Sequence, residues 1–249
     1  MDPRVAGRRA EVGRAAGRKR LGVLLTLLSL SLLTAAVLFV AHSSLLSARH
    51  VRISGNVMTP AQEILAASGL ETHPPLIDVS ISRVVAGIDK LPWIERVRVA
   101  RDWPDSVSIT VTERNPVAVL VLSPRRAAVL DATGRVLEFA ASVPKNLVPI
   151  AAPGDPVSAG AWLGPPGATL ARVAAAVPAS VLSSIAELKE SALGVEVALR
   201  SGAVADLGRA TGLAAKMVAL ATLLQTPTVV LGPRSSIDLR VPEAPVVTS

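Results

Sequence analysis

Ser142 and Lys145 stand three residues apart, the spacing of the nucleophile and its lysine partner in Ser-x-x-Lys acyl enzymes. In that pattern the serine opens a helix, and Pro144 disfavours a helix here. The companion Ser-Asp-Asn and Lys-Thr-Gly boxes are missing from the sequence. The spacing alone makes an exported envelope enzyme that uses Ser142 and Lys145 the alternative function. Because the helix and the companion boxes are not indicated, we expect that the chain is not an enzyme.

Other catalytic or ligand-binding groups are sparse. The sequence contains no cysteine, and its three histidines, His42, His50 and His73, have no partners at metal-ligand spacing. Glu187 and Glu190 lie three residues apart on an expected helix, where such a pair normally marks a solvated face. No phosphate-binding loop or dinucleotide fingerprint is present. We expect no catalytic residue, no metal, no cofactor and no small-molecule substrate.

The net charge of +7 belongs mainly to the first 20 residues. Asp2 and Glu11 oppose seven basic residues there, which are Arg4, Arg8, Arg9, Arg14, Arg18, Lys19 and Arg20. A nucleic-acid-binding protein would carry its charge on the folded body and would stack bases on aromatic side chains, which make up only 2% of this chain. Nucleic acid is therefore not an expected partner.

Residues 21–41 contain no charged side chain, and as a helix they would extend roughly 31 Å, about the thickness of a bilayer core. The alternative is a cleaved signal peptide, but its apolar region is usually only ~7–15 residues long. We expect a transmembrane helix at 21–41 and a basic cytoplasmic tail at 1–20, because positive flanks stay in the cytoplasm. The chain is then a single-pass type II membrane protein with extracytoplasmic C-terminal domains.

Two folded regions follow the span. The sequence shows alternating strands, a helix that Thr59 caps and Gly69 closes, with Pro60 at its first position, and a second amphipathic helix. These signals predict the order β-α-α-β-β over residues 46–114, the layout of a POTRA module. The predicted strands cover 51–53, 94–99 and 107–112, and the helices begin after Thr59 and Ser80.

Residues 115–241 predict a β-rich second domain with packed helices, so the fold class is α+β. The predicted strands are 117–122, 127–131, 136–139, 194–199, 203–207 and 236–241, and the predicted helices are 168–177, 180–190 and 211–225, the last capped by Thr211. A proline-rich loop is expected near 144–166 and a disordered tail at 242–249.

Several short motifs in this order resemble the bacterial cell-division proteins of the FtsQ/DivIB family. They are Val51–Asn56, Pro92-Trp93, Trp103-Pro104, Val111–Val117, Asp131–Gly134, Gly202–Gly208 before a helix with Lys216, and Ile237–Pro242. The resemblance implies a bitopic scaffold of the divisome that links early and late division proteins at the septum and regulates septal cell-wall synthesis through protein contacts. A POTRA-bearing export component is excluded because the region after Pro116 lacks the long strands of a lipid-facing barrel.

The family resemblance also implies partners. They are FtsB-like and FtsL-like coiled-coil division proteins and other divisome components, bound in the family near the C-terminal end of the β domain by strand addition. On this sequence the implied partner-binding residues are Ala203, Val204, Ala205, Ile237, Asp238, Leu239, Arg240 and Val241. The other interpretation, that Ile237 and Leu239 simply face the core, stays open. Tyrosine is absent, so no tyrosine can anchor a partner at this site.

Overall fold

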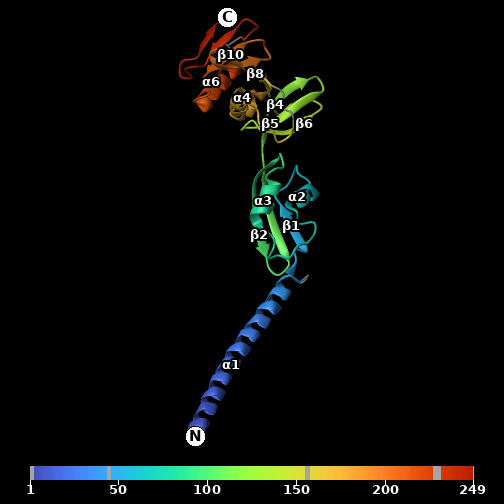
Figure 1. Ribbon diagram of the computed structural model, residues 1–249. Coiled ribbons are helices and arrows are strands. Elements are labelled where there is room, and N and C mark those ends of the chain that lie inside the picture. The colour runs from blue at the N-terminus through green and yellow to red at the C-terminus, as the bar shows by residue number, and fades with distance from the viewer. Residues whose placement is uncertain (1–2, 44–45, 155–157, 227–230, 249) are drawn as a thin grey trace.

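The structure is a computed structural model and describes residues 3–43, 46–154, 158–226 and 231–248. Figure 1 shows an elongated molecule in which a long N-terminal helix, a small three-stranded sheet and a larger sheet follow one another along the chain. The α+β class and the order of apolar N-terminal helix, POTRA fold and β-rich fold are confirmed.

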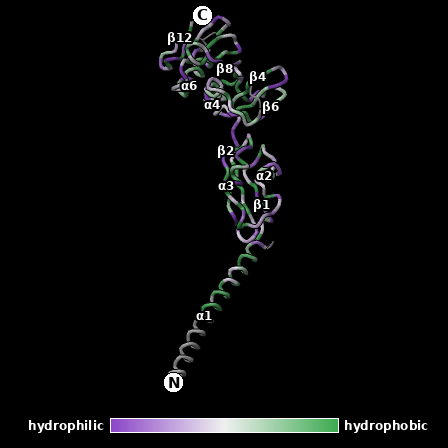
Figure 2. Tube along the Cα trace, in the orientation of Figure 1, coloured by the Kyte–Doolittle hydropathy of each residue, from purple (hydrophilic) through white to green (hydrophobic). Residues whose placement is uncertain are grey.

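The first helix, α1 (Pro3–Ala41), contains the apolar segment Gly22–Ala41, which is long and apolar enough to cross a membrane. Figure 2 shows this segment as the apolar half of α1 that adjoins the first sheet. The hydroxyls of Thr26 and Thr34 donate to the carbonyls of Gly22 and Leu30 at 2.9 Å. These side-chain donors are therefore satisfied within the helix, as a lipid environment requires.

The three-stranded sheet and its two helices form the POTRA fold. Its elements are β1 (His50–Ser54), α2 (Ala61–Ser68), α3 (Ile81–Ile88), β2 (Ile94–Asp102) and β3 (Ser106–Glu113). The strand order is β1-β3-β2, with β1 parallel and β2 antiparallel to β3. The predicted β-α-α-β-β order is thus confirmed, with strands somewhat longer than the alternating segments.

The POTRA core forms where the helices cover one face of this sheet. Ile64 of α2 and Ile88 of α3 are fully buried with Ile109 of β3. Gly69 ends α2 in the left-handed conformation, as its position in the sequence predicted. The N-cap residues, Pro60 and Ser80, make no side-chain capping bond, so helix packing supplies the stability that the caps do not.

Nine strands make the larger sheet over the described residues, in the order β12-β11-β10-β9-β8-β7-β4-β5-β6. The strands are β4 (Pro116–Ser123), β5 (Arg126–Asp131), β6 (Val136–Ala140), β7 (Val148–Ala151), β8 (Ile185–Ser191), β9 (Gly194–Leu199), β10 (Val204–Gly208), β11 (Ser236–Asp238) and β12 (Val246–Thr248). The helices are α4 (Pro165–Ala175), α5 (Ala179–Leu182) and α6 (Leu213–Gln225). Leu170 of α4 and Met217 of α6 are buried in its core.

The predicted helix over 180–190 is wrong. Helix α5 ends at Leu182, and the chain then enters β8, which lies between β7 and β9. The sequence of β8 has helical propensity, but pairing on both sides in the sheet overrides it. Glu187 and Glu190 therefore do not share a helix face.

Four further features differ from the predictions. The 144–166 segment is not simply a loop, because it contains β7 and the start of α4, while residues 155–157 lie outside the described residues. The expected disordered tail is wrong for β12, which pairs antiparallel with β11. The last predicted strand is shorter, since β11 ends at Asp238, and helix α6 follows Gly212 as its N-cap rather than Thr211.

Candidate functional site

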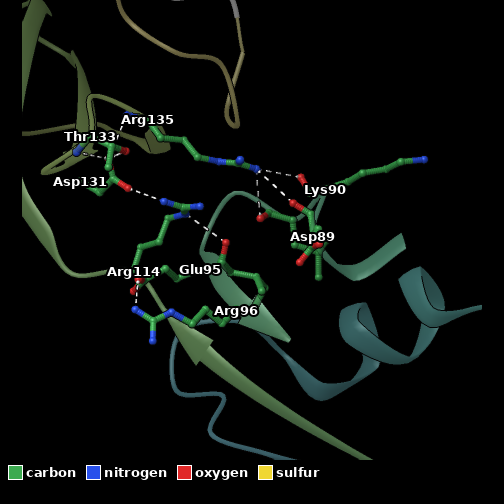
Figure 3. Close-up of polar contacts among 10 residues, drawn as sticks. Asp89, Lys90, Glu95, Arg96, Arg114, Asp131, Thr133 and Arg135 are labelled. Atoms are coloured by element: carbon green, nitrogen blue, oxygen red, sulfur yellow. Dashed lines mark hydrogen bonds and ion pairs between the residues drawn. The ribbon is translucent and has the colours of Figure 1, made fainter. Parts of the chain in front are cut away.

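An ion pair joins the POTRA fold to the larger sheet. Arg114, in the link between β3 and β4, donates from Nη1 to Oδ2 of Asp131 at 2.7 Å, and the two side chains are only 14% and 6% exposed. The same guanidinium donates from Nε to the Ile94 carbonyl at 3.0 Å. Figure 3 shows Arg114 lying between the two folds with Asp131 above it. One side chain therefore bonds to both folds.

Asp131 is held in its ionised form. Its Oδ1 accepts hydrogen bonds from the amide and hydroxyl of Thr133 at 2.9 and 2.6 Å and from the amide of Arg135 at 2.9 Å. Burial acts to raise the pKa of this carboxyl, but the hydrogen bonds from Thr133, Arg135 and Arg114 together lower the pKa below 3.8. The motif Asp131–Gly134 thus forms a turn that its own aspartate organises.

A second arginine strengthens the junction. Arg135 Nη2 lies 3.4 Å from the carbonyl oxygens of Asp89, Lys90 and Leu91, just after α3 (Figure 3). The guanidinium carbons of Arg114 and Arg135 lie 5.7 and 5.4 Å from the centre of the Trp162 ring. These contacts hold the larger sheet in place relative to the POTRA fold. The strands at the far end of that sheet are positioned through the same contacts.

One carboxylate organises the POTRA loop after β1. Glu113 accepts hydrogen bonds from the amides of Val57, Met58 and Thr59 at 3.0, 2.8 and 2.7 Å. Burial acts to raise the pKa of Glu113, but these backbone bonds outweigh it and lower the pKa below 4.5. The sequence reasoning did not identify this role of Glu113, since the partners lie more than 50 residues away.

The far end of the larger sheet holds the predicted partner-binding residues. Strand β10 pairs in parallel with β11, so that Ala205 lies opposite Ile237. The Leu239 amide continues this pairing with a 2.8 Å hydrogen bond to the Asp206 carbonyl. Strand β10 therefore lies between β9 and β11, and strand β11 lies between β10 and β12. The sheet edge at this end is β12, which the sequence reasoning missed.

The eight predicted residues divide into two groups by burial. Ala203, Ala205, Ile237 and Leu239 are completely buried in the core, so the interpretation that Ile237 and Leu239 face the core is correct for their side chains. Val204, Asp238, Arg240 and Val241 are partly or fully accessible. The structure thus brings all eight to one end of the sheet but presents only the second group to solvent.

Asp238 and Arg240 form a close pair beside the β12 edge. Arg240 Nε lies 3.0 Å from each carboxylate oxygen of Asp238, and the Arg240 amide donates to Oδ1 at 3.0 Å. The guanidinium lowers the pKa of Asp238 to about 2. Both groups remain charged at neutral pH. Beside them, Val246 and Val247 of β12 and Val241 offer exposed apolar side chains.

The residues of the enzymatic alternative lack the arrangement that the alternative requires. Ser142 and Lys145 are exposed and lie between β6 and β7 outside any helix. Within the described ranges there is no group of three or more His, Asp or Glu side chains that could hold a metal ion. The local geometry therefore gives no support to Ser-x-x-Lys chemistry.

A single apolar helix followed by a POTRA fold and a β-rich fold defines the class of membrane-anchored POTRA proteins. The model of the "POTRA domain, FtsQ-type" family matches residues 46–114. The cell division protein FtsQ of a Geobacter species is 35% identical over 80 residues, which cover 32% of this chain and 29% of that protein. FtsQ of Streptomyces venezuelae is 32% identical over 126 residues, which cover 50% of this chain and 46% of that protein.

A longer match exists to FtsQ of Streptomyces griseus, which is 27% identical over 212 residues that cover 83% of this chain and 99% of that protein. The major extracytoplasmic domain of the division protein DivIB from Geobacillus stearothermophilus superposes with a TM-score of 0.27 at 21% identity, covering 35% of this chain and 72% of that domain. Residues 46–114 are therefore similar to the POTRA domain of FtsQ-type division proteins, and most of the chain is similar to FtsQ. The matched segments span less than half of the first two relatives named above.

Proposed function

We propose that this chain is a bitopic scaffold of the divisome that links early and late division proteins and regulates septal cell-wall synthesis through protein contacts, without catalysis. Its parts are a basic cytoplasmic tail (1–20), the membrane helix, a POTRA domain (46–114) and a β domain (115–241) outside the cytoplasm. The observation that carries the proposal is the FtsQ-type POTRA fold on one membrane helix, joined by a buried ion pair to a sheet with an open edge.

The partner-binding site of the scaffold is the terminal sheet edge, with β12 as the strand to which a partner adds. An edge strand offers backbone N–H and C=O groups to an incoming strand. Val246 and Val247 supply apolar contacts, and the Asp238–Arg240 pair supplies charges beside them. FtsB-like and FtsL-like coiled-coil proteins are the partners, and each would contribute a short extended segment here. The buried members of the predicted set hold this edge in place.

The cellular test uses depletion of the protein with a fluorescent fusion in the source bacterium. Filamentous cells and signal at midcell would support the scaffold role and the septal location. Normal division with uniform membrane signal would contradict both. A reporter that is active only outside the cytoplasm, fused to the C-terminus, tests the orientation.

A matched pair of variants tests the edge itself. Val246→Asp places a charge among the apolar contacts of β12, whereas Leu193→Asp does the same in the β8–β9 turn, and the two native side chains are 57% and 60% exposed. Val246→Asp should weaken capture of the coiled-coil partner and fail to complement depletion, while Leu193→Asp should behave as the native chain. Equal behaviour of both variants would place the partner elsewhere.

A further inference from the structure

The POTRA fold contacts the end of the membrane helix through the segment that precedes α3. His42 follows the apolar helix directly, and its Nε2 lies 3.7 Å from Oδ1 of Asp78. The Leu76 amide donates to the Leu46 carbonyl at 2.7 Å. Because the apolar span ends at Ala41, residues 76–79 lie at the level where the hydrocarbon core gives way to headgroups.

The turn between β2 and β3 lies at the same end of the POTRA fold (Figure 1). The amides of Arg49 and His50 donate to the Asp105 carbonyl at 2.9 and 3.2 Å, and His50 pairs with Ser106 in the parallel register of β1 and β3. These bonds hold the turn beside the residues that leave the membrane.

Arg101 joins the two segments into one surface. Its guanidinium donates from Nε and Nη2 to the Val79 carbonyl at 3.1 and 2.6 Å. We call residues 49–50, 76–79 and 101–106 the membrane-proximal rim. The bonds from Arg101 fix the turn relative to Asp78, and Asp78 in turn lies against the end of the span.

The rim exposes apolar side chains that a water-facing loop does not need. Trp103, at the tip of the turn, is 54% exposed, and Ile77 is also exposed. Arg49 and His50 are exposed beside them. Tryptophan is favoured at the membrane–water interface, where its ring contacts lipid while the indole N–H stays hydrated. Arginine can meet the lipid phosphates at the same depth.

We propose that the membrane-proximal rim is a lipid-binding surface, in which Trp103 and Ile77 enter the headgroup region of the bilayer that α1 spans and Arg49 lies at the phosphates. The POTRA fold then has a second attachment to the membrane besides α1, which restricts its tilt and keeps the β12 edge at a fixed height above the bilayer. This surface acts independently of any protein partner, so its test is separate from that of the scaffold role.

The chain's three tryptophans, Trp93, Trp103 and Trp162, permit a direct test, because none lies in α1. The full chain is reconstituted in vesicles of phosphatidylcholine and phosphatidylglycerol, with and without bromine on the acyl chains near the headgroup. Bromine quenches tryptophan emission only at short range. The native chain should lose emission in the brominated vesicles, and Trp103→Phe should remove that loss.

Trp162→Phe is the matched control, because Trp162 is 56% exposed but lies against Arg114 and Arg135 at the junction, and Arg114 follows the end of β3 that is opposite to the β2–β3 turn. This variant should lose the same absolute intensity to bromine as the native chain. Native-like circular dichroism of each variant establishes that it is folded. If the native chain is not quenched, or if Trp103→Phe is quenched as strongly as the native chain, the lipid surface is refuted.

Discussion

The buried pair Arg114–Asp131 is expected to be a major contributor to the stability of the junction. Asp131→Ala removes the ion pair and leaves the Arg114 guanidinium, which is only 14% exposed, without its counter-charge. It also removes the acceptor of three further hydrogen bonds, two from Thr133 and one from Arg135. Removing one member of a buried pair typically costs ~3–5 kcal/mol, and we expect a loss of about 3 kcal/mol because Arg114 keeps its bond to Ile94.

The assay is urea unfolding in detergent micelles, followed by circular dichroism. The control is Glu95→Ala, which breaks the exposed pair that Glu95 forms with Arg96 and should cost no more than ~1 kcal/mol (Figure 3). If Asp131→Ala costs no more than this control, the stabilising role assigned to the junction is refuted.

The same pair predicts a pH dependence. The folded-state pKa of Asp131 is lowered, so its contribution is fully present above the unfolded pKa of about 3.8 and falls as the pH drops through the folded value. The difference in stability between the native chain and Asp131→Ala should therefore shrink only below pH 3.8. A difference that already disappears near neutral pH would contradict this assignment.

Three other substitutions test how local contacts hold the two folds. Lys216→Met leaves two carbonyls without the ammonium that donates to them at 2.6 and 2.9 Å, and unfolding should become easier by ~1–3 kcal/mol. Glu113→Gln removes the charge that binds three loop amides, and hydrogen exchange of those amides should become faster. Gly194→Ala places a Cβ 2.2 Å from the Gly208 carbonyl oxygen at φ 129°, and should lower the melting temperature more than Gly154→Ala, whose new Cβ meets nothing within 4 Å.

The POTRA fold could be predicted from the sequence because its signals are local. The alternation in β2 and β3, the apolar spacing in α3 and the glycine that ends α2 each act over a few residues. The parallel pairing of β1 with β3 rather than with β2 is not local, and no pattern along the sequence indicated it.

The larger sheet was harder to predict because its pairing is not local. Strand β7 is only four residues long, contains Pro149, and gains its place between β4 and β8 from parallel neighbours distant in sequence. Strand β8 carries a helical sequence and is held extended by β7 and β9. Neither β7 nor β8 has a sequence pattern that indicates a strand before its neighbours in the sheet are known.

The predicted partner-binding residues lie together at one end of the sheet, but the edge strand there is β12, one strand beyond the predicted terminal strand β11. Val246 and Val247 are too short a run to indicate a strand, and β12 forms only because β11 is already in place. The sequence also identified Arg114 and Asp131 as parts of separate motifs. Their contact depends on how the two folds meet, which no spacing along the chain reveals.

The central claim is that β12 is the strand to which a partner adds, and disulfide mapping tests it most directly. The chain has no cysteine, so Val247→Cys places a single thiol on β12, and Glu138→Cys places one on β6, the opposite edge of the same sheet. A disulfide requires Cα atoms ~4.4–6.8 Å apart. With a series of single-cysteine variants of the FtsB-like partner, we predict efficient cross-linking to Val247→Cys and none to Glu138→Cys. A partner that still binds but cross-links at β6 or nowhere on β12 would contradict the account.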